Sequence, residues 1–241
     1  MTRVSDALDR VKVTFDDLVA DVGLLLVATL SQRLGPEALV NTTLCLVGRV
    51  GGERPGRKIL TLVNATCVSA SHSDHTDRLW ASASGSVMGH RVMALSTIGT
   101  LLRAFTFGHC RQMKAVVGHT LQRACALGAG PGVKPLAIDI DSTICEVNGH
   151  DKAGTAFGYT GRLGYHPHVA TRADSGEVLY ARMRKGSANT QRGTVRFLDD
   201  LIAGVRRGGA SCELTVHVDS GFWSNDTITA LNRLNVRHTM A

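Results

Sequence analysis

Three aspartates stand where a folded chain could bring their carboxylates together. Asp139 and Asp141 alternate with apolar residues, and Asp219 follows a second apolar stretch, 78 residues after Asp141. Carboxylates gathered in one place repel one another unless a hard cation such as Mg²⁺ binds between them. Two such ions, about 4 Å apart, catalyse phosphoryl transfer by activating the attacking oxygen and stabilising the leaving one. These residues therefore predict a metal site, with Asp141 and Asp219 as catalytic ligands and Asp139 as a further metal ligand.

A simpler interpretation stays open at this point. Asp141 precedes Ser142-Thr143 and could cap a local turn, and Asp219-Ser220-Gly221 could be an ordinary turn at the end of a strand. Which interpretation holds depends on the elements that carry the aspartates.

The residue pattern after position 135 predicts strands. Residues 136–145 alternate in strand periodicity, which places Asp139 and Asp141 on one face of a mostly buried strand. Two further strands are expected over about 166–173 and 177–183, and the intervening Asp174-Ser175-Gly176 has the chemistry of a hairpin turn. This pair of strands should be antiparallel.

Helices and strands then alternate toward the end of the chain. Asn189 or Thr190 is expected to cap a helix that ends at Gly208-Gly209, followed by a strand over 214–218, a helix from 225 or 226 and an extended segment over 235–241. The order β-β-β-α-β-α-β is that of the RNase H-like fold, in which the first and fourth strands are neighbours and parallel. By this fold analogy, Asp141 and Asp219 should lie close in space.

The first part of the chain has a different character. Residues 1–133 show helical periodicity interrupted by Gly and Pro, and the Gly- and Pro-rich segment 128–135 resembles a linker. We therefore expect two domains, a mainly helical region over 1–133 and an α/β core over 134–241. Of the formal charge of +7, +5 belongs to residues 1–133, so this region is the better candidate for DNA binding, with Arg103 and Arg111 as candidate contacts.

Composition narrows the class of protein. A hydrophobic content of 44% supports a packed core and argues against a disordered chain, and a sequence pI near 9.4 is typical of proteins that bind phosphate groups. The six cysteines form no CxxC pair, and no signal peptide is recognised, so a cytoplasmic location is expected, on the nucleoid when bound to DNA. The longest apolar run, residues 22–30, is shorter than the roughly 20 residues that cross a bilayer, and no membrane association is expected.

Several blocks of the sequence resemble bacterial insertion-sequence transposases of the DDE class, in particular the group with a DxDST motif in the first strand. The blocks are Leu136–Glu146, Phe157–Pro167, Gly186–Gly193 and Val218–Phe222. Upstream, Gly89–Arg91, Ser96–Arg103 and Phe107–Gln112 are similar to the helical segment of the same group. The resemblance covers about residues 85–241.

This resemblance implies a function and a set of site residues. Asp141 and Asp219 correspond to the first two catalytic acids, which in the intact enzyme hold two Mg²⁺ or Mn²⁺ ions. The expected partners are double-stranded DNA, as terminal inverted repeats and target DNA, and further copies of the chain in a synaptic complex. Asn189, Arg192 and His166 are candidate DNA contacts, the first two because backbone N–H groups at a helix start favour phosphate. For His166 the alternative is a packed turn formed by Tyr165-His166-Pro167.

The family pattern also includes a third acid, a glutamate beyond the fifth strand. The last glutamate of this sequence is Glu213, which precedes the fourth strand. We therefore expect a chain truncated at its C-terminal end, with an incomplete RNase H-like core and little strand-transfer activity. The alternative is a remnant that binds DNA without cleaving it.

Overall fold

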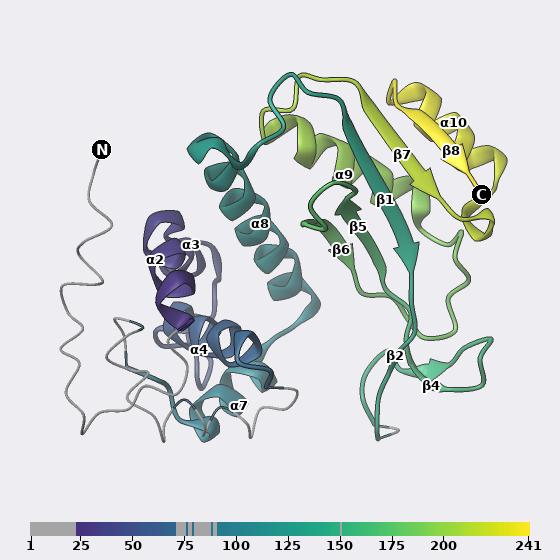
Figure 1. The fold of residues 1–241 in the computed structure, drawn as a ribbon. Helices are drawn as coiled ribbons and strands as arrows, with labels where there is room; N and C mark the ends of the chain where they lie inside the picture. The colour runs from purple at the N-terminus through teal and green to yellow at the C-terminus, as the bar shows by residue number, and fades with distance from the viewer. Residues whose placement is uncertain (1–22, 71–75, 77–78, 80–87, 89–90, 150) are drawn as a thin grey trace. The chain divides into compact units, whose positions relative to one another are not determined.

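A computed structural model of the chain describes residues 23–70, 76, 79, 88, 91–149 and 151–241. The chain divides into two units, residues 1–120 and 121–241, drawn from purple to yellow along the sequence in Figure 1. Among the described residues, no helix combines the length and the apolar character needed to span a bilayer.

Regular structure in the described part of the first unit is entirely helical. Its helices are α2 (Leu24–Leu34), α3 (Pro36–Thr43), α4 (Pro55–Cys67), α7 (Leu95–Ala104) and α8 (Phe107–Ala124). Gly35 ends α2 with a left-handed φ of 62°, and Pro36 starts α3, which is the usual placement of these two residue types. Helical periodicity was expected over residues 1–133, and the part of it before residue 23 lies outside the described residues.

One core of this unit joins α3, α7 and α8. Its buried side chains are Val40, Leu44, Leu46, Leu101 and Val116. The buried His109 fixes the start of α8, because its Nδ1 lies 2.9 Å from the Thr106 nitrogen and its Nε2 lies 3.0 Å from the Cys45 carbonyl oxygen. α7 and α8 are therefore two separate helices.

The segment expected as a linker is partly helical. A π-helical turn, Cys125–Ala129, follows α8 directly. Within this turn the chain leaves the helical path at Gly128, whose φ is 102°. Arg172 donates a hydrogen bond to the Ala129 carbonyl, and the Cys125 sulfur approaches Gly208, so this turn belongs to the second unit. The division between the units consequently falls at 120/121, ahead of the expected 133/134.

The second unit is built on a five-stranded sheet. In spatial order its strands are β6 (Val178–Arg182), β5 (His168–Arg172), β1 (Leu136–Ser142), β7 (Leu214–Val218) and β8 (Arg237–Met240). β5 pairs antiparallel with both β1 and β6, whereas β7 pairs parallel with both β1 and β8. The expected antiparallel hairpin and the expected parallel pairing of the first and fourth strands are both confirmed.

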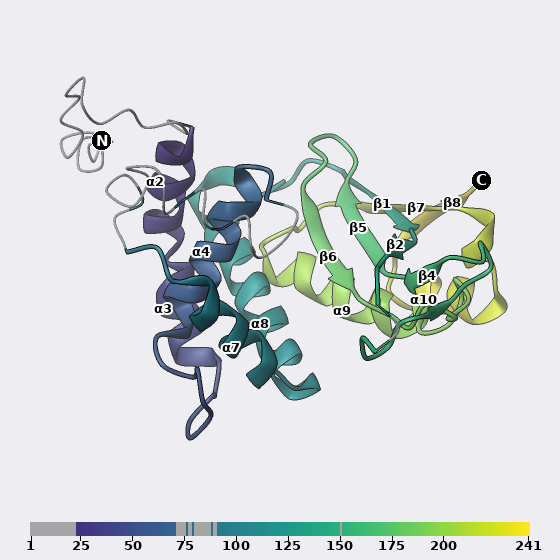
Figure 2. The same cartoon turned by 90° about the horizontal axis from the view of Figure 1, so that it is seen from below.

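Two helices cover one face of this sheet. α9 (Thr194–Arg207) and α10 (Asn225–Arg233) lie on the same side of the strands in Figures 1 and 2. The apolar side chains on that face alternate along the strands and pack on the helices, which explains the strand periodicity. They are Leu136, Ile138, Ile140, Leu214, Val216 and Val218 from the strands and Phe197, Leu198, Leu201, Ile202 and Leu231 from the helices.

A small second sheet was not expected from the sequence. It contains β2 (Cys145–Glu146), β4 (Leu163–Tyr165) and β3 (Ala156–Phe157), all between β1 and β5. Each strand has only two or three residues, too few to show a periodicity. Gly186 lies against this sheet, because a Cβ atom there would be only 2.1 Å from the Gly164 carbonyl oxygen and 2.3 Å from that of Ala156.

The expected start of α9 is wrong by three or four residues. α9 begins at Thr194 with Gly193 as N-cap, and no side chain caps it. Asn189 instead closes the preceding turn, since its Oδ1 accepts a hydrogen bond from the Arg192 N–H at 2.9 Å. A polar residue that caps a turn and one that caps a helix use the same short-range bond, so the sequence did not separate them.

Candidate active site

The parallel pairing of β1 and β7 sets the geometry of the predicted site. The last paired residues of the two strands are Ile140 and Val218, and Asp219 keeps an extended backbone with φ −76° and ψ 168°. Asp141 and Asp219 are thus the next residues on neighbouring strands, which lie about 4.8 Å apart in a sheet. Both are exposed, at the carboxyl ends of their strands.

These aspartates lie on the face of the sheet opposite α9 and α10. Ile138 and Ile140 point into the core between the sheet and these helices, so Asp139 and Asp141 point away from it. The Asp141 carboxylate accepts a hydrogen bond from the Ser142 N–H at 2.6 Å, and the Asp219 carboxylate lies beside Gly221. Neither carboxylate has a cationic partner among the described residues, so both remain available to a cation.

Asp139 has a specific partner on the neighbouring strand. Asp139 and His217 are opposite each other in the β1–β7 register, and His217 Nδ1 lies 2.9 Å from Asp139 Oδ1. About half of each side chain is exposed, so the pair is solvated. One Asp139 oxygen is therefore engaged by the His217 imidazole. This pair lies two residues before Asp141 and Asp219 on their strands.

The donor set fits a hydrated magnesium ion. Within the described ranges, no group of three or more His, Cys, Asp or Glu side chains is close enough to form a metal cage. Mg²⁺ is commonly held by one or two carboxylates, with water and substrate phosphates as its remaining ligands. Asp141 and Asp219 satisfy that requirement, whereas Asp139 is directed to His217.

Residues 185–193, which follow Arg184 in the chain between β6 and α9, form one side of the site; we call this segment the β6–α9 connection. Thr190 Oγ1 lies 3.4 Å from Ser142 Oγ at the end of β1, and Gln191 donates from Nε2 to the Trp223 carbonyl at 2.6 Å. A Cβ atom on Gly221 would lie 3.5 Å from Thr190 and 3.0 Å from Asp219 Oδ1. The connection therefore contacts Ser142, directly after Asp141, and Trp223, four residues after Asp219.

Two buried histidines bind the backbone of this connection. His166 Nδ1 lies 2.7 Å from the Ala188 carbonyl oxygen, and His168 Nε2 lies 2.9 Å from that of Thr190. Because a carbonyl oxygen only accepts, each ring nitrogen in contact carries the proton. Burial, followed by the positive charge of Arg184, lowers the pKa of His168 to about 4, so this ring is neutral near pH 7.

Arg184 makes the largest number of contacts with the connection. Its Nη1 donates to three carbonyl oxygens, those of Asn189 (2.6 Å), Arg192 (3.0 Å) and Thr190 (3.3 Å). Its Nε donates to the His166 carbonyl at 2.8 Å. Burial, with a smaller effect of Arg182, lowers the pKa of Arg184 to about 10, which leaves it charged at neutral pH.

The predicted DNA contacts are distributed unevenly. Asn189 and Arg192 are exposed on the β6–α9 connection, beside the strand ends, and Arg103 and Arg111 are exposed on α7 and α8 of the first unit. His166 is 1% exposed, so the prediction that its side chain contacts DNA is wrong. Its ring is used to hold the chain at Ala188 instead.

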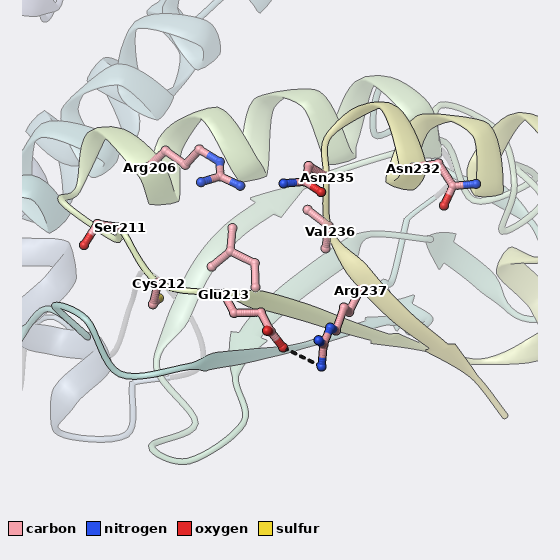
Figure 3. A pocket seen from close by; sticks show the side chains of 9 residues that line it. Arg206, Ser211, Cys212, Glu213, Asn232, Asn235, Val236 and Arg237 are labelled. Atoms are coloured by element: carbon pink, nitrogen blue, oxygen red, sulfur yellow. Dashed lines mark ion pairs between the residues drawn. The ribbon is translucent and has the colours of Figure 1, made fainter.

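A cavity of the second unit lies at the other end of the strands. It has a volume of about 560 Å³ and opens beside Glu213, which precedes β7, and Arg237, the first residue of β8. Figure 3 shows Arg206 and Asn235 directed toward each other above the ion pair of Glu213 with Arg237, which measures 2.9 Å. Because the carboxylates lie at the carboxyl ends of β1 and β7, this cavity is separate from the candidate site.

Four residues of the site were missed in the sequence: Arg184, His168, Thr190 as a neighbour of Ser142, and His217. For His217 a signal existed, because it follows Asp139 by the same 78 residues that separate Asp141 from Asp219. For Arg184 and His168 there was no such signal, since their partners are backbone carbonyls, which every residue possesses.

Comparison with known proteins places these features in a family. The family model described as "Transposase DDE domain group 1" matches residues 5–241, which includes the helical first unit as well as the sheet. A search of curated proteins finds no match. The match extends further toward the N-terminus than the motifs in the sequence indicated.

Similarity to solved structures is distant. The intasome of simian T-cell lymphotropic virus, in complex with PP2A regulatory subunit B56 gamma, is 22% identical over 52% of this chain and 43% of its own, with a TM-score of 0.31. The piggyBac transposase synaptic complex with hairpin DNA is 12% identical over 95% and 52%, with a TM-score of 0.45. The pre-cleavage Mos1 transpososome is 11% identical over 75% and 58%, with a TM-score of 0.25. The chain spans about half the length of these proteins.

Proposed function

Because this chain belongs to the family of transposases with a DDE domain, we propose that it takes part in DNA transposition, through metal-dependent phosphoryl transfer at the ends of a mobile element. The observation that carries the proposal is the pairing of parallel β1 and β7, which places Asp141 beside Asp219 on the exposed face of the sheet. We further propose that this sheet is the first part of an RNase H-like catalytic core.

In this proposal, Asp141 and Asp219 hold a divalent cation, Mg²⁺ or Mn²⁺. The bound ion would supply an activated oxygen nucleophile and stabilise the leaving oxygen of the phosphodiester. The protein contributes two fixed carboxylates at neighbouring strand ends and an open face through which DNA can approach. Asp139 contributes less directly, because His217 engages one of its oxygens.

DNA is the proposed substrate, as terminal inverted repeats and as target. Asn189 and Arg192 lie where they could contact phosphates next to the carboxylates, and Arg103 and Arg111 offer exposed positive charge on the first unit. Backbone phosphates are the usual partners of such side chains. A cytoplasmic protein that assembles into an oligomeric synaptic complex on DNA fits this role.

The proposed function can be tested with the 241-residue chain and a duplex that carries the ends of its element. We expect Mg²⁺- or Mn²⁺-dependent nicking that is lost in Asp141→Asn and Asp219→Asn, because each substitution removes a metal ligand. Asp151→Asn is the matched control, since Asp151 is an exposed acid outside the site. Nicking that persists in both site variants would show that these aspartates are not the catalytic pair.

A second candidate is DNA binding without cleavage. This candidate is favoured because the described residues place two carboxylates, rather than three, at the ends of β1 and β7. In that case the chain binds end DNA in a salt-dependent manner, no nicking occurs, and Asp141→Asn leaves the affinity unchanged. Coupled loss of nicking in the two aspartate variants would exclude this candidate.

A further inference from the structure

The β6–α9 connection bridges the two strand ends that carry the aspartates. On one side, Thr190 contacts Ser142, the residue after Asp141. On the other, Gln191 donates to the Trp223 carbonyl. A short chain segment that contacts both ends limits how far they can move relative to each other.

The connection itself is held mainly by one side chain. The guanidinium of Arg184 donates to carbonyl oxygens on both sides of Gln191, and His168 adds a bond to Thr190. A planar guanidinium presents several donors in a fixed geometry, whereas a lysine ammonium is a compact charge on a flexible stem. The number of carbonyl partners therefore requires arginine specifically.

We propose that Arg184 is a positioning residue for the metal site. The β1–β7 ladder brings Asp141 and Asp219 together, and Arg184, by fixing Thr190 beside Ser142 and Gln191 against the Trp223 carbonyl, holds the segments that follow the two aspartates in place. The proposal rests on the proposed function, because it assumes that these two carboxylates share a divalent cation. A guanidinium is a donor only and is not a metal ligand, so Arg184 acts through the backbone carbonyls that it binds.

The sign of the effect separates positioning from simple electrostatics. A positive charge near a cation site repels the cation, so removal of Arg184 should strengthen cation binding if charge alone matters. If Arg184 positions the carboxylates, its removal should weaken binding. Partners that act through a metal ligand commonly change metal affinity by roughly 10- to 100-fold when they are replaced.

The test is Mn²⁺ binding to the full 241-residue chain, followed by the electron paramagnetic resonance signal of free Mn²⁺. We expect Arg184→Met and Arg184→Lys each to weaken binding by about tenfold or more. Arg196→Met is the matched control, since Arg196 is an exposed arginine on α9, and it should bind Mn²⁺ as the unmodified chain does. Thermal unfolding of every variant shows whether it is folded.

Gln191→Leu keeps the proposal testable if the Arg184 variants do not fold. This exposed side chain donates one bond to the strand-end segment, so its loss should weaken Mn²⁺ binding several-fold without unfolding the chain. Folded Arg184 variants that bind Mn²⁺ as tightly as the unmodified chain, or more tightly, would overturn the proposal. With unfolded Arg184 variants, unchanged binding by Gln191→Leu would overturn it.

Failure of the proposed function gives a different result. If Asp141→Asn and Asp219→Asn bind Mn²⁺ as the unmodified chain does, the carboxylate site itself is wrong, and the role of Arg184 falls with it. If those two variants lose binding while Arg184→Met and Gln191→Leu keep it, the metal site stands and only the positioning role is wrong.

Discussion

Asp139 and His217 face each other across the parallel strands β1 and β7, with Asp139 Oδ1 2.9 Å from His217 Nδ1. They are separated by 78 residues, as are Asp141 and Asp219 two positions further along the strands. One register therefore creates both pairs. The contact between Asp139 and His217 is therefore evidence for the β1–β7 register that also makes Asp141 and Asp219 neighbours.

The Asp139–His217 pair should contribute little to stability. Both side chains are about half exposed, and solvated ion pairs typically contribute about 1 kcal/mol or less. We expect His217→Ala to change the free energy of unfolding by less than about 1 kcal/mol in urea denaturation. A loss of more than about 2 kcal/mol, well above that range, would mean that the pair is not solvated as described.

Asp139 should also matter less to the cation than Asp141 does. Because His217 engages one Asp139 oxygen, we expect Asp139→Asn to weaken Mn²⁺ binding less than Asp141→Asn does. Titration of both variants with Mn²⁺ under the same conditions measures the difference. Equal losses would place Asp139 among the metal ligands.

Stability should fall in mild acid because of His168. The folded pKa of His168 is about 4, whereas its ordinary value is 6.5, so the unfolded chain binds a proton that the folded chain does not over this interval. The contribution of His168 is fully present above pH 6.5 and is lost as the pH falls toward 4. Its slope is at most about 1.4 kcal/mol per pH unit.

Urea denaturation between pH 4 and 7 measures this dependence. Carboxylates also titrate near the lower end, so the informative quantity is the difference between the unmodified chain and His168→Gln, whose amide can still donate to Thr190 but does not titrate. Arg184, His166 and Arg182 remain as neighbouring charges in both chains. Parallel pH profiles for the two would contradict the burial of His168.

Gly186 should not tolerate a side chain. A Cβ atom would meet the backbone oxygens of Gly164 and Ala156 at 2.1 and 2.3 Å, and backbone cannot move aside as the end of a flexible side chain can. We expect Gly186→Ala to destabilise the chain by about 2 kcal/mol or more, in the range of overpacking effects. Gly204→Ala is the control, because a Cβ atom at Gly204 meets open space, and this variant should be neutral or stabilising. Gly209→Ala is not a suitable control, because the φ of Gly209 is 92°.

Arg192 should contribute one phosphate contact if DNA passes over the β6–α9 connection. Each phosphate contact adds about 0.9 to the slope of log affinity against log salt concentration, so Arg192→Ala should reduce the slope by about that amount. Fluorescence anisotropy with end-containing duplex measures it. Arg207→Ala, an exposed arginine in the last turn of α9, should leave the slope unchanged, and equal slopes for all three chains would remove Arg192 from the DNA path.

The sequence predicted the elements of the sheet because they depend on local patterns. Burial of alternate residues such as Ile138 and Ile140 follows from strand periodicity, and the parallel neighbours β1 and β7 follow from the element order. The start of α9 was misplaced because Asn189 can close a turn or cap a helix, and packing decides between the two.

The candidate site was predictable only where side chains carry the chemistry. Asp141 and Asp219 could be predicted as neighbours because the order of the elements predicts that their strands are adjacent and parallel, as they are. Arg184 could not, because it acts on carbonyl oxygens of a connection whose path is set by close approach of Gly186 to the small sheet. The sequence left two roles open for His166, a DNA contact and a packed turn, and its burial agrees with the packed turn.

The central claim is that Asp141 and Asp219 share one divalent cation, and paramagnetic broadening by Mn²⁺ tests it most directly. In amide spectra of the 241-residue chain, substoichiometric Mn²⁺ should broaden the signals of residues 141–143 and 219–221 together, and Asp219→Asn should remove the broadening at both strand ends. Broadening that stays at residues 141–143 in Asp219→Asn, or that appears at neither strand end in the unmodified chain, would contradict a shared site.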